Sequence, residues 1–191
     1  MQLLKDRILS EGIAVNDDIL RVDSFINHQV DPELMMAIGS DFAEHFKNSD
    51  VTKVVTIESS GIAPALCTAS ALKVPMIILK KQPSKILNDE LYHTMITSYT
   101  KGTSYELTLS TEFVNENDHV LIVDDFLANG AAVEGLCDLI RQAGAETAGA
   151  AIVIEKGFQD GGRKLRESGL RVESLAIIDG MDENGIRFRQ Q

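Results

Sequence analysis

Apolar residues follow two different rhythms along this chain, and the first is helical. Side chains from Leu34 to Phe46 recur at steps of three and four residues, which is typical of one buried helix face. Asp31 and Pro32 suit the N-cap and the first helical position. The pattern therefore predicts a helix that begins at this pair and ends near Lys47.

The second rhythm consists of short β-branched runs. Five of them have the length and composition of buried strands: residues 53–58, 75–79, 120–124, 148–154 and 172–178. We expect residues 172–178 to form the last strand of the chain. Helical patterns lie between them, at residues 62–72 and in the segment that ends at Gly144. Strands alternating with helices predict an α/β fold, with a mainly parallel twisted sheet flanked by helices. Since 44% of the 191 residues are hydrophobic and 25% are charged, we expect one domain over residues 1–191.

Residues 80–111 differ from the rest of the chain. They are rich in Ser, Thr, Tyr and Lys and are interrupted by Gly102. This composition predicts weak strands at most. Because long polar insertions in compact domains often serve as lids, we expect a hood or flexible loop here.

The run VLIVDDFLANGAA (residues 120–132) combines a buried strand, two acidic residues and a turn of small residues. In an open α/β sheet, ligands bind beyond the carboxyl ends of the strands. The small side chains of Ala128, Asn129, Gly130, Ala131 and Ala132 let backbone N–H groups approach a ligand beside a helix N-terminus, as in a phosphate site. Carboxylates such as Asp124 and Asp125 can accept hydrogen bonds from a vicinal diol. The run is therefore consistent with a 5-phosphorylated ribose, although it could also be only a capped, tight turn.

The charge balance narrows the range of partners. A net charge of -11 argues against non-specific nucleic-acid binding, which needs a basic surface. An anionic ligand must therefore be held by local amides, a metal ion or a few lysines. Cys67 and Cys137 lie in apolar helical patterns, so we expect free thiols and no dedicated metal site.

Targeting signals are missing from the pattern. The first residues, MQLLKDRILSEG, lack the uninterrupted apolar core of a signal peptide, and no apolar stretch is long enough to cross a bilayer. We expect a cytoplasmic protein without a membrane partner.

Residues 120–132 resemble the phosphoribosyl-pyrophosphate motif of the type I phosphoribosyltransferase family. Further segments, which with this one span nearly the whole chain, are similar to the bacterial xanthine phosphoribosyltransferases of that family: ILRVDSFINHQVDPELM (19–35), ESSGIAPAL (58–66), FLANG (126–130) and IVIEKGFQ (152–159). The resemblance implies the type I fold and transfer of phosphoribosyl to xanthine in purine salvage. It also implies Mg²⁺ bound mainly through phosphoribosyl pyrophosphate, a homodimer, a purine-binding segment at residues 1–30 and a hood at residues 80–111.

The resemblance also assigns roles to the phosphate-facing residues. Residues 128–132 would bind phosphoribosyl pyrophosphate, and Asp124 and Asp125 would act as the catalytic acidic pair facing the ribose. The pyrophosphate loop corresponds to Ser59, Ser60 and Gly61, and Lys80 and Lys81 are positioned to neutralise pyrophosphate. Without the resemblance, these serines would be a simple helix cap and these lysines a solvated cluster.

The purine contacts implied by the resemblance are Leu20, Asn27 and Lys156. A Lys can donate to an exocyclic purine oxygen, an Asn can both donate and accept, and Phe158 could pack on the ring. Taken alone, Leu20 would be a core residue, whereas Asn27 and Lys156 would be surface residues.

One position departs from related enzymes. Hypoxanthine-guanine enzymes of the family carry an Asp where this chain has Ala128. Either a residue of the hood such as Glu106 acts as the base, or xanthine reacts in its ionised form. Asn129 and Ala132 also replace Thr residues of many relatives, which leaves phosphate binding more dependent on backbone amides.

Two alternatives remain open. An enzyme using adenine, guanine or hypoxanthine would keep the same fold. A phosphoribosyl-pyrophosphate-sensing regulator would keep the ligand but would need a basic face or a DNA-binding domain, neither of which is evident.

Overall fold

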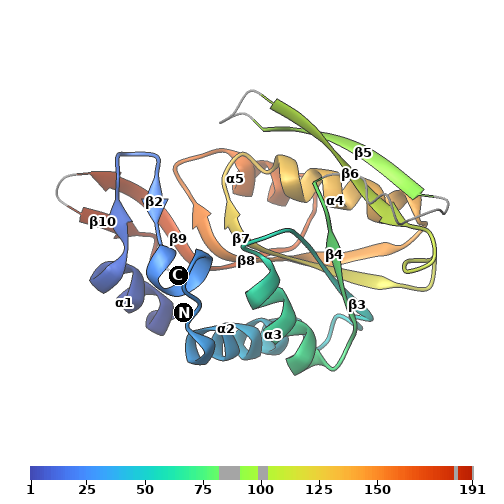
Figure 1. The fold of residues 1–191 in the computed structure, drawn as a ribbon, viewed down its shortest axis with the longest axis horizontal. Helices are drawn as coiled ribbons and strands as arrows, with labels where there is room; N and C mark the ends of the chain where they lie inside the picture. Colours follow the sequence, from blue (N-terminus) through green and yellow to red (C-terminus); the bar gives the residue numbers. More distant parts are fainter. Residues whose placement is uncertain (82–90, 99–102, 183–184, 191) are drawn as a thin grey trace.

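The computed structural model describes residues 1–81, 91–98, 103–182 and 185–190. Its centre is a six-stranded sheet in the order β10-β9-β8-β7-β3-β4, shown in Figure 1. Neighbouring strands from β4 to β9 pair in parallel, and only β10 is antiparallel to its neighbour. The strands are β3 (Lys53–Ile57), β4 (Met76–Leu79), β7 (His119–Leu127), β8 (Glu146–Lys156), β9 (Val172–Asp182) and β10 (Gly185–Phe188).

All five strands expected from the β-branched runs are present, with two corrections. β9 is not the last strand, because β10 folds back on it with Gly185 paired to Asp182. β7 also continues beyond the acidic pair, because its pairing with β8 extends to Leu127 opposite Glu155. Asp124 and Asp125 therefore lie inside a strand that ends only at Leu127.

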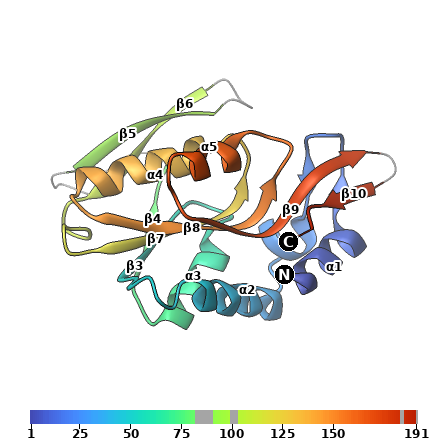
Figure 2. The same ribbon diagram turned by 180° about the vertical axis from the view of Figure 1, so that it is seen from behind.

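Helices cover both faces of the sheet, as Figures 1 and 2 show. On one face lie α2 (Pro32–His45) and α3 (Ile62–Leu72), and on the other lie α4 (Ala131–Gln142) and the short α5 (Gly161–Glu167), which the sequence pattern did not predict. The predicted start of α2 is confirmed, since the Asp31 carboxylate accepts from the N–H groups of Glu33 and Leu34 at 3.0 and 3.1 Å. Among the described residues, no helix is long and apolar enough to span a membrane.

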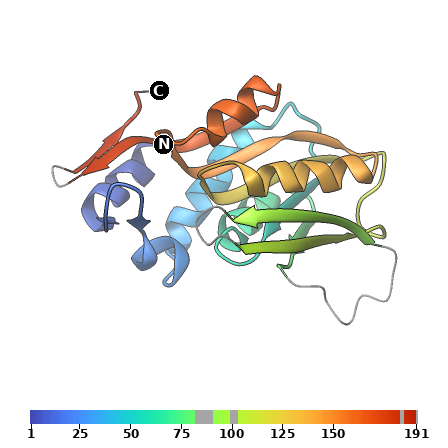
Figure 3. The same cartoon turned by 90° about the horizontal axis from the view of Figure 1, so that it is seen from above.

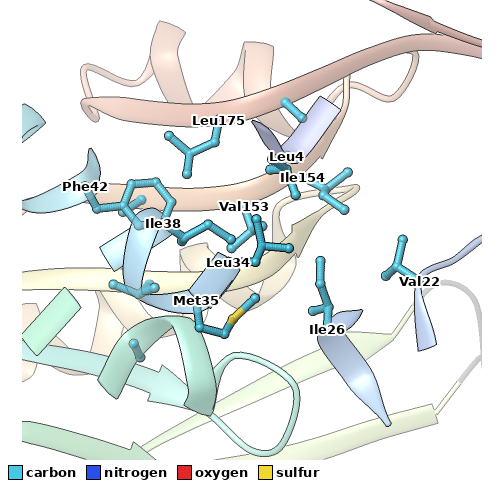
Figure 4. Packing of buried hydrophobic residues seen from close by; sticks show 14 of the residues in the cluster. Leu4, Val22, Ile26, Leu34, Met35, Ile38, Phe42, Val153, Ile154 and Leu175 are labelled. Atoms are coloured by element: carbon cyan, nitrogen blue, oxygen red, sulfur yellow. The ribbon is translucent and has the colours of Figure 1, made fainter. Parts of the chain in front are cut away.

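Two apolar cores result from the alternation of side chains along the central strands. In β7, Leu121 and Val123 pack toward α2 and α3, whereas Val120 and Ile122 pack toward α4. The first core, part of which is drawn in Figure 4, joins Phe42 of α2 to β8, β9 and the N-terminal segment. Because both faces are buried, the strands read as continuous apolar runs.

The N-terminal segment forms a small unit against the end of the sheet. Helix α1 (Gln2–Glu11) is followed by the hairpin of β1 (Ile13–Ala14) and β2 (Leu20–Arg21), and then by a π-helical turn, Asp23–Asn27. Leu4 and Ile8 of α1 are fully buried in the first core. This packing fixes the unit at one end of the molecule (Figure 3).

Residues of the polar insertion form a second hairpin. β5 (Leu91–Ser98) and β6 (Thr103–Ser110) pair antiparallel over eight residues each, so they are longer than the weak strands expected. Ile96 packs on α4 so closely that a Cβ added at Gly135 would lie 2.6 Å from its terminal carbon. The hairpin therefore lies directly over the helix that follows the phosphate-type turn, at the far end from the N-terminal segment (Figure 3).

Candidate active site

Two adjoining cavities open at the carboxyl ends of the central parallel strands, where ligands bind in α/β sheets. The larger has a volume of about 470 Å³ and is lined by residues 126–133 with Ile96, Thr97, Tyr105, Asp124 and Gln159. The smaller, of about 130 Å³, is lined by Ile57, Glu58, Ser59, Ser60, Lys81, Tyr105, Asp124, Asp125 and Ala132. Because the two cavities share Tyr105, Asp124 and Ala132, they form one continuous candidate site.

The acidic pair lies at the junction of the two cavities. Asp124 is only 9% exposed, and its Oδ1 accepts from the backbone N–H of Asp125 at 3.0 Å. Burial, and next the charge of Asp125, raise the pKa of Asp124 well above its ordinary value. Burial also raises the pKa of Asp125. One buried and one half-buried carboxylate therefore face space that a cation or hydroxyl groups could fill favourably.

Residues 128–132, the predicted phosphate loop, all line the larger cavity. Gly130 has a φ of 90°, a conformation that glycine adopts without strain, and α4 begins directly after it. The Asn129 side chain accepts from the Ala131 N–H at 3.1 Å. Asn129 thus stabilises the turn by an internal hydrogen bond. The Ala131 N–H is therefore shared between this bond and any ligand.

The turn between β3 and α3 forms part of the lining of the smaller cavity. Ser59 and Ser60 line the smaller cavity, and buried Gly61 lies behind them against Asp124. A Cβ at Gly61 would be 3.1 Å from Asp124 Oδ1 and 2.3 Å from Thr56 Oγ1, so the chain can pass here only as glycine. The predicted pyrophosphate loop and the acidic pair are therefore in direct proximity.

Of the two predicted lysines, only one reaches the site. Lys81 lines the smaller cavity, its backbone N–H donates to Glu58 at 2.9 Å, and its ammonium lies 5.8 Å from the ring centre of Tyr105. Lys80 is exposed and lines neither of the two cavities.

None of the four predicted purine residues lines the larger cavity. Leu20 is 7% exposed and belongs to the first core, as its alternative interpretation expects. Asn27 is exposed at the end of the π-helical turn, and Phe158 is 38% exposed beyond the end of β8. Lys156 connects the two segments, because its ammonium lies 3.5 Å from Asp18 Oδ1 in the N-terminal hairpin. The structure thus brings Lys156 close to residues 1–30 but does not gather all four side chains.

Sequence reasoning missed Tyr105, Phe126 and Gln159, which all line the larger cavity. Phe126 lies two residues beyond Asp124 in the same strand, so strand alternation could have placed both on one face. Burial, and next the charge of Asp124, raise the pKa of Tyr105, so its phenol stays protonated at neutral pH. Glu106 follows Tyr105 and faces the other way, with one carboxylate oxygen 3.0 Å from His93 Nδ1.

A divalent cation fits the donor set only if a ligand shares it. No group of three potential metal-binding side chains occurs in the described ranges of the chain. The carboxylates of Asp124 and Asp125 are nevertheless oxygen donors of the kind that Mg²⁺ prefers, and Mg²⁺ commonly keeps waters and substrate oxygens as its remaining ligands.

Comparison with known proteins places the whole chain in one family. Residues 29–188 match the phosphoribosyl transferase domain. A protein named xanthine phosphoribosyltransferase from Oceanobacillus iheyensis is 51% identical over 191 residues, covering 100% of this chain and 98% of that protein. Another of the same name, from Agathobacter rectalis, is 54% identical over 191 residues and covers 100% of both.

Solved structures confirm the expected fold. The adenine phosphoribosyltransferase of Rhodothermus marinus superposes with a TM-score of 0.73, covering 91% of this chain and 98% of that one at 22% sequence identity. The mainly parallel sheet flanked by helices is thus the type I phosphoribosyltransferase fold. On the evidence of its fold, its domain match and its full-length relatives, the chain belongs to the phosphoribosyltransferase family.

Proposed function

We propose that this protein transfers the 5-phosphoribosyl group of phosphoribosyl pyrophosphate to xanthine. The products are xanthosine 5′-monophosphate and pyrophosphate, as in purine salvage. One observation carries the reaction type: an acidic pair, of which Asp124 is buried, lines a continuous cavity together with a turn of small residues and a serine-containing turn. The base is taken from relatives that are more than half identical over the full chain and bear the name xanthine phosphoribosyltransferase.

The three parts of the site correspond to the three parts of phosphoribosyl pyrophosphate. The turn at residues 128–132 would hold the 5-phosphate with backbone amides at the N-terminus of α4. Asp124 and Asp125 would accept from the ribose hydroxyls, and Ser59 and Ser60 would hold the pyrophosphate. Binding at both ends of the sugar orients its anomeric carbon toward the incoming purine nitrogen.

Bond breaking places positive charge on the ribose ring and negative charge on pyrophosphate. Asp124 and Asp125 stabilise the positive charge, whereas the amides and hydroxyls of residues 59–61 and the Lys81 ammonium stabilise the leaving group. Asp124 and Asp125 would help to hold Mg²⁺ with the substrate, and the ion would supply further charge neutralisation. The β5–β6 hairpin, which packs on α4, would help to exclude water from the site.

Neither residue considered as a general base for the purine places a carboxylate in the larger cavity. Ala128 carries no carboxylate, and Glu106 points away from the cavity toward His93. We therefore favour ionised xanthine as the nucleophile, with the nearby Lys156 ammonium balancing its charge. Phe126, which lines the larger cavity, and Phe158, which is 38% exposed, would offer apolar surfaces to the ring.

The test is product formation with xanthine, guanine, hypoxanthine and adenine in parallel, in the presence of phosphoribosyl pyrophosphate and Mg²⁺. We expect preference for xanthine, and we expect this preference to fall in Lys156→Ala but not in Lys164→Ala, a change at an exposed lysine of α5. Turnover of another base would refute the base assignment and keep the reaction. Tight binding of phosphoribosyl pyrophosphate without any turnover would favour the regulator instead.

Two further expectations belong to the same proposal. The protein is expected to be a cytoplasmic homodimer, and residues 1–30 and 80–111 are expected to act as the purine segment and the hood of a single domain. Residues 82–90 and 99–102 of the hood lie outside the described residues. Light scattering at micromolar concentration measures the oligomeric state directly.

A further inference from the structure

The loop between β1 and β2 is built to present one carboxylate. The Asn16 side-chain oxygen accepts from the N–H groups of Asp18 and Ile19 at 2.9 and 2.7 Å, and the Val15 N–H donates to the Ile19 carbonyl at 2.8 Å. This local network is an Asx-type turn that holds the backbone at Asp18. Leu20, two residues after Asp18, is buried in the first core and fixes the loop to the domain.

Asp18 contacts the turn that follows β8, far away in the sequence. Its Oδ1 accepts from Gln159 Nε2 at 2.6 Å and lies 3.5 Å from Lys156 Nζ. The turn brings these two side chains together, because the Gln159 N–H donates to the Lys156 carbonyl at 2.9 Å. One carboxylate thus holds both a cation and an amide at the edge of the larger cavity, which Gln159 also lines.

The contact with Asp18 decides which end of the Gln159 side chain is available to a ligand. Its amide nitrogen is engaged by Asp18, and no described residue donates to its oxygen. The oxygen is therefore free to accept from a ligand N–H. Lys156, which is 14% exposed at its side chain, keeps ammonium protons to donate to a carbonyl oxygen.

We propose that Asp18 is a positioning residue that determines base specificity. By holding Lys156 and Gln159 together, it presents a donor beside an acceptor, which complements the C=O and N–H groups of a dioxopurine edge. Adenine in the same orientation presents an amino donor at position 6 and a ring-nitrogen acceptor at position 1, the reverse of the xanthine order, so the ammonium would face a donor and the Gln159 oxygen a lone pair. The inference rests on the proposed function for the identity of the base, but the contacts of Asp18 stand independently of it.

The experiment compares Asp18→Ala and Asp18→Asn with Asp17→Ala, a change at the exposed carboxylate next to it in the same loop. We expect Asp18→Ala to raise KM for xanthine about tenfold and to lower the preference for xanthine over adenine by a similar factor. KM for phosphoribosyl pyrophosphate should stay within about twofold. Asp18→Asn, which can still accept from Gln159, should show a smaller loss, and Asp17→Ala should match the unmodified protein.

A double-variant cycle separates positioning from simple packing. If Asp18 acts through Gln159, adding Asp18→Ala to Gln159→Ala should raise KM for xanthine by much less than it does in the unmodified protein. Fully additive effects would overturn the inference, as would equal rises in both KM values together with a lower Tm. The proposed function is tested separately, by whether the unmodified protein turns over xanthine. The role of Asp18 is tested by the ratios of KM values between the variants and the unmodified protein.

Discussion

The proposed phosphoribosyl half and the proposed purine half of the site are built in different ways. The first consists largely of one continuous stretch, from Asp124 to Ala132, in which a strand, a turn and a helix N-terminus follow each other directly. The second is assembled from side chains 138 and 141 residues apart, at Asp18, Lys156 and Gln159. A site made from one βα unit can be read from local chemistry, whereas an assembled site becomes visible only when distant segments pack together.

The two halves also depend on different supports. The phosphate turn is backed by α5, whose Gly161 N–H donates to the Ala128 carbonyl at 3.2 Å. Helix α5 is held in turn by Arg166, which binds both oxygens of the buried Glu155 carboxylate at 2.8 and 2.7 Å. The purine half depends on the N-terminal hairpin and its burial in the first core. Changes to one support should therefore affect one substrate and spare the other.

The largest effect is expected from Asp124→Asn, which removes a charge proposed to stabilise the ribose ring as its bond to pyrophosphate breaks. Losing its charge-assisted bonds should lower kcat/KM on the order of a hundredfold. The same change should raise the stability of the unliganded protein at neutral pH, since burial disfavours the ionised form. Steady-state kinetics and thermal unfolding, measured on one preparation, check both expectations.

The two buried residues Asp124 and Asp118 should make the stability of the folded protein depend on pH in opposite directions. Because the pKa of Asp124 is raised in the folded protein, its favourable contribution is present below about pH 4 and is lost as pH rises through the folded-state pKa. Asp118 is the opposite case: burial raises its pKa, but Lys53 at 2.8 Å and further hydrogen bonds outweigh this and hold it below the ordinary value. Its contribution is present at neutral pH and is lost as pH falls. Asp118→Asn should therefore cost about 1–3 kcal/mol at pH 7, and stabilisation by that change would contradict the argument.

The next largest effect is expected from Gly161→Ala. Its new Cβ would lie 2.2 Å from the Ala128 carbonyl oxygen and 2.6 Å from the Gly130 nitrogen, so the phosphate turn must move. We expect KM for phosphoribosyl pyrophosphate to rise about tenfold, with an overpacking cost of about 1–3 kcal/mol. KM for xanthine should change little.

Gly169→Ala provides the matched control for that change. Gly169 has a φ of 91° but nothing within 4 Å of an added Cβ, so the change tests backbone strain without a collision. It should lower Tm and leave both KM values as they are. If KM for xanthine rises in Gly161→Ala but not in Gly169→Ala, the phosphoribosyl half and the purine half of the site do not have separate supports.

A smaller effect, confined to the purine half, is expected from Phe158→Ala. Loss of an aromatic contact of about 0.5–1.5 kcal/mol corresponds to a rise in KM for xanthine of about two- to tenfold. Stability should change little because the side chain is 38% exposed. Phe113→Ala, at a side chain 48% exposed, is the control and should leave both KM values unchanged. Equal effects of the two changes would remove Phe158 from the purine site.

The smallest effect is expected from Thr56→Val, beneath the acidic pair. The Thr56 hydroxyl is fully buried and has no hydrogen-bond partner among the described residues. Removing it should be neutral or stabilise the protein by about 1 kcal/mol. In contrast, Thr68→Val should cost about 1 kcal/mol, since the Thr68 hydroxyl donates to the Pro64 carbonyl at 2.8 Å. A tenfold rise in KM for phosphoribosyl pyrophosphate in Thr56→Val would instead show that this hydroxyl acts on the site.

Local sequence predicted the elements whose signals are local. The cap at Asp31, the apolar spacing of α2 and the β-branched runs of the parallel sheet all appear in the structure where the pattern places them. It missed α5, because Gly161 and Gly162 are poor helix formers that are present for close packing against Ala128 and Glu155. It also missed β10, a four-residue strand that depends on pairing with β9.

What the sequence by itself determined is the local framework of the proposed phosphoribosyl half: two acidic residues, a turn of small residues and a following helix, all within one βα unit whose geometry is local. Only the tertiary structure decided that Tyr105 and Gln159 line the cavity, that Glu106 faces away from it, and that Asp18 meets Lys156. The physical reason is that strand register and the packing of the N-terminal hairpin on the core are set by long-range burial, which no local pattern encodes.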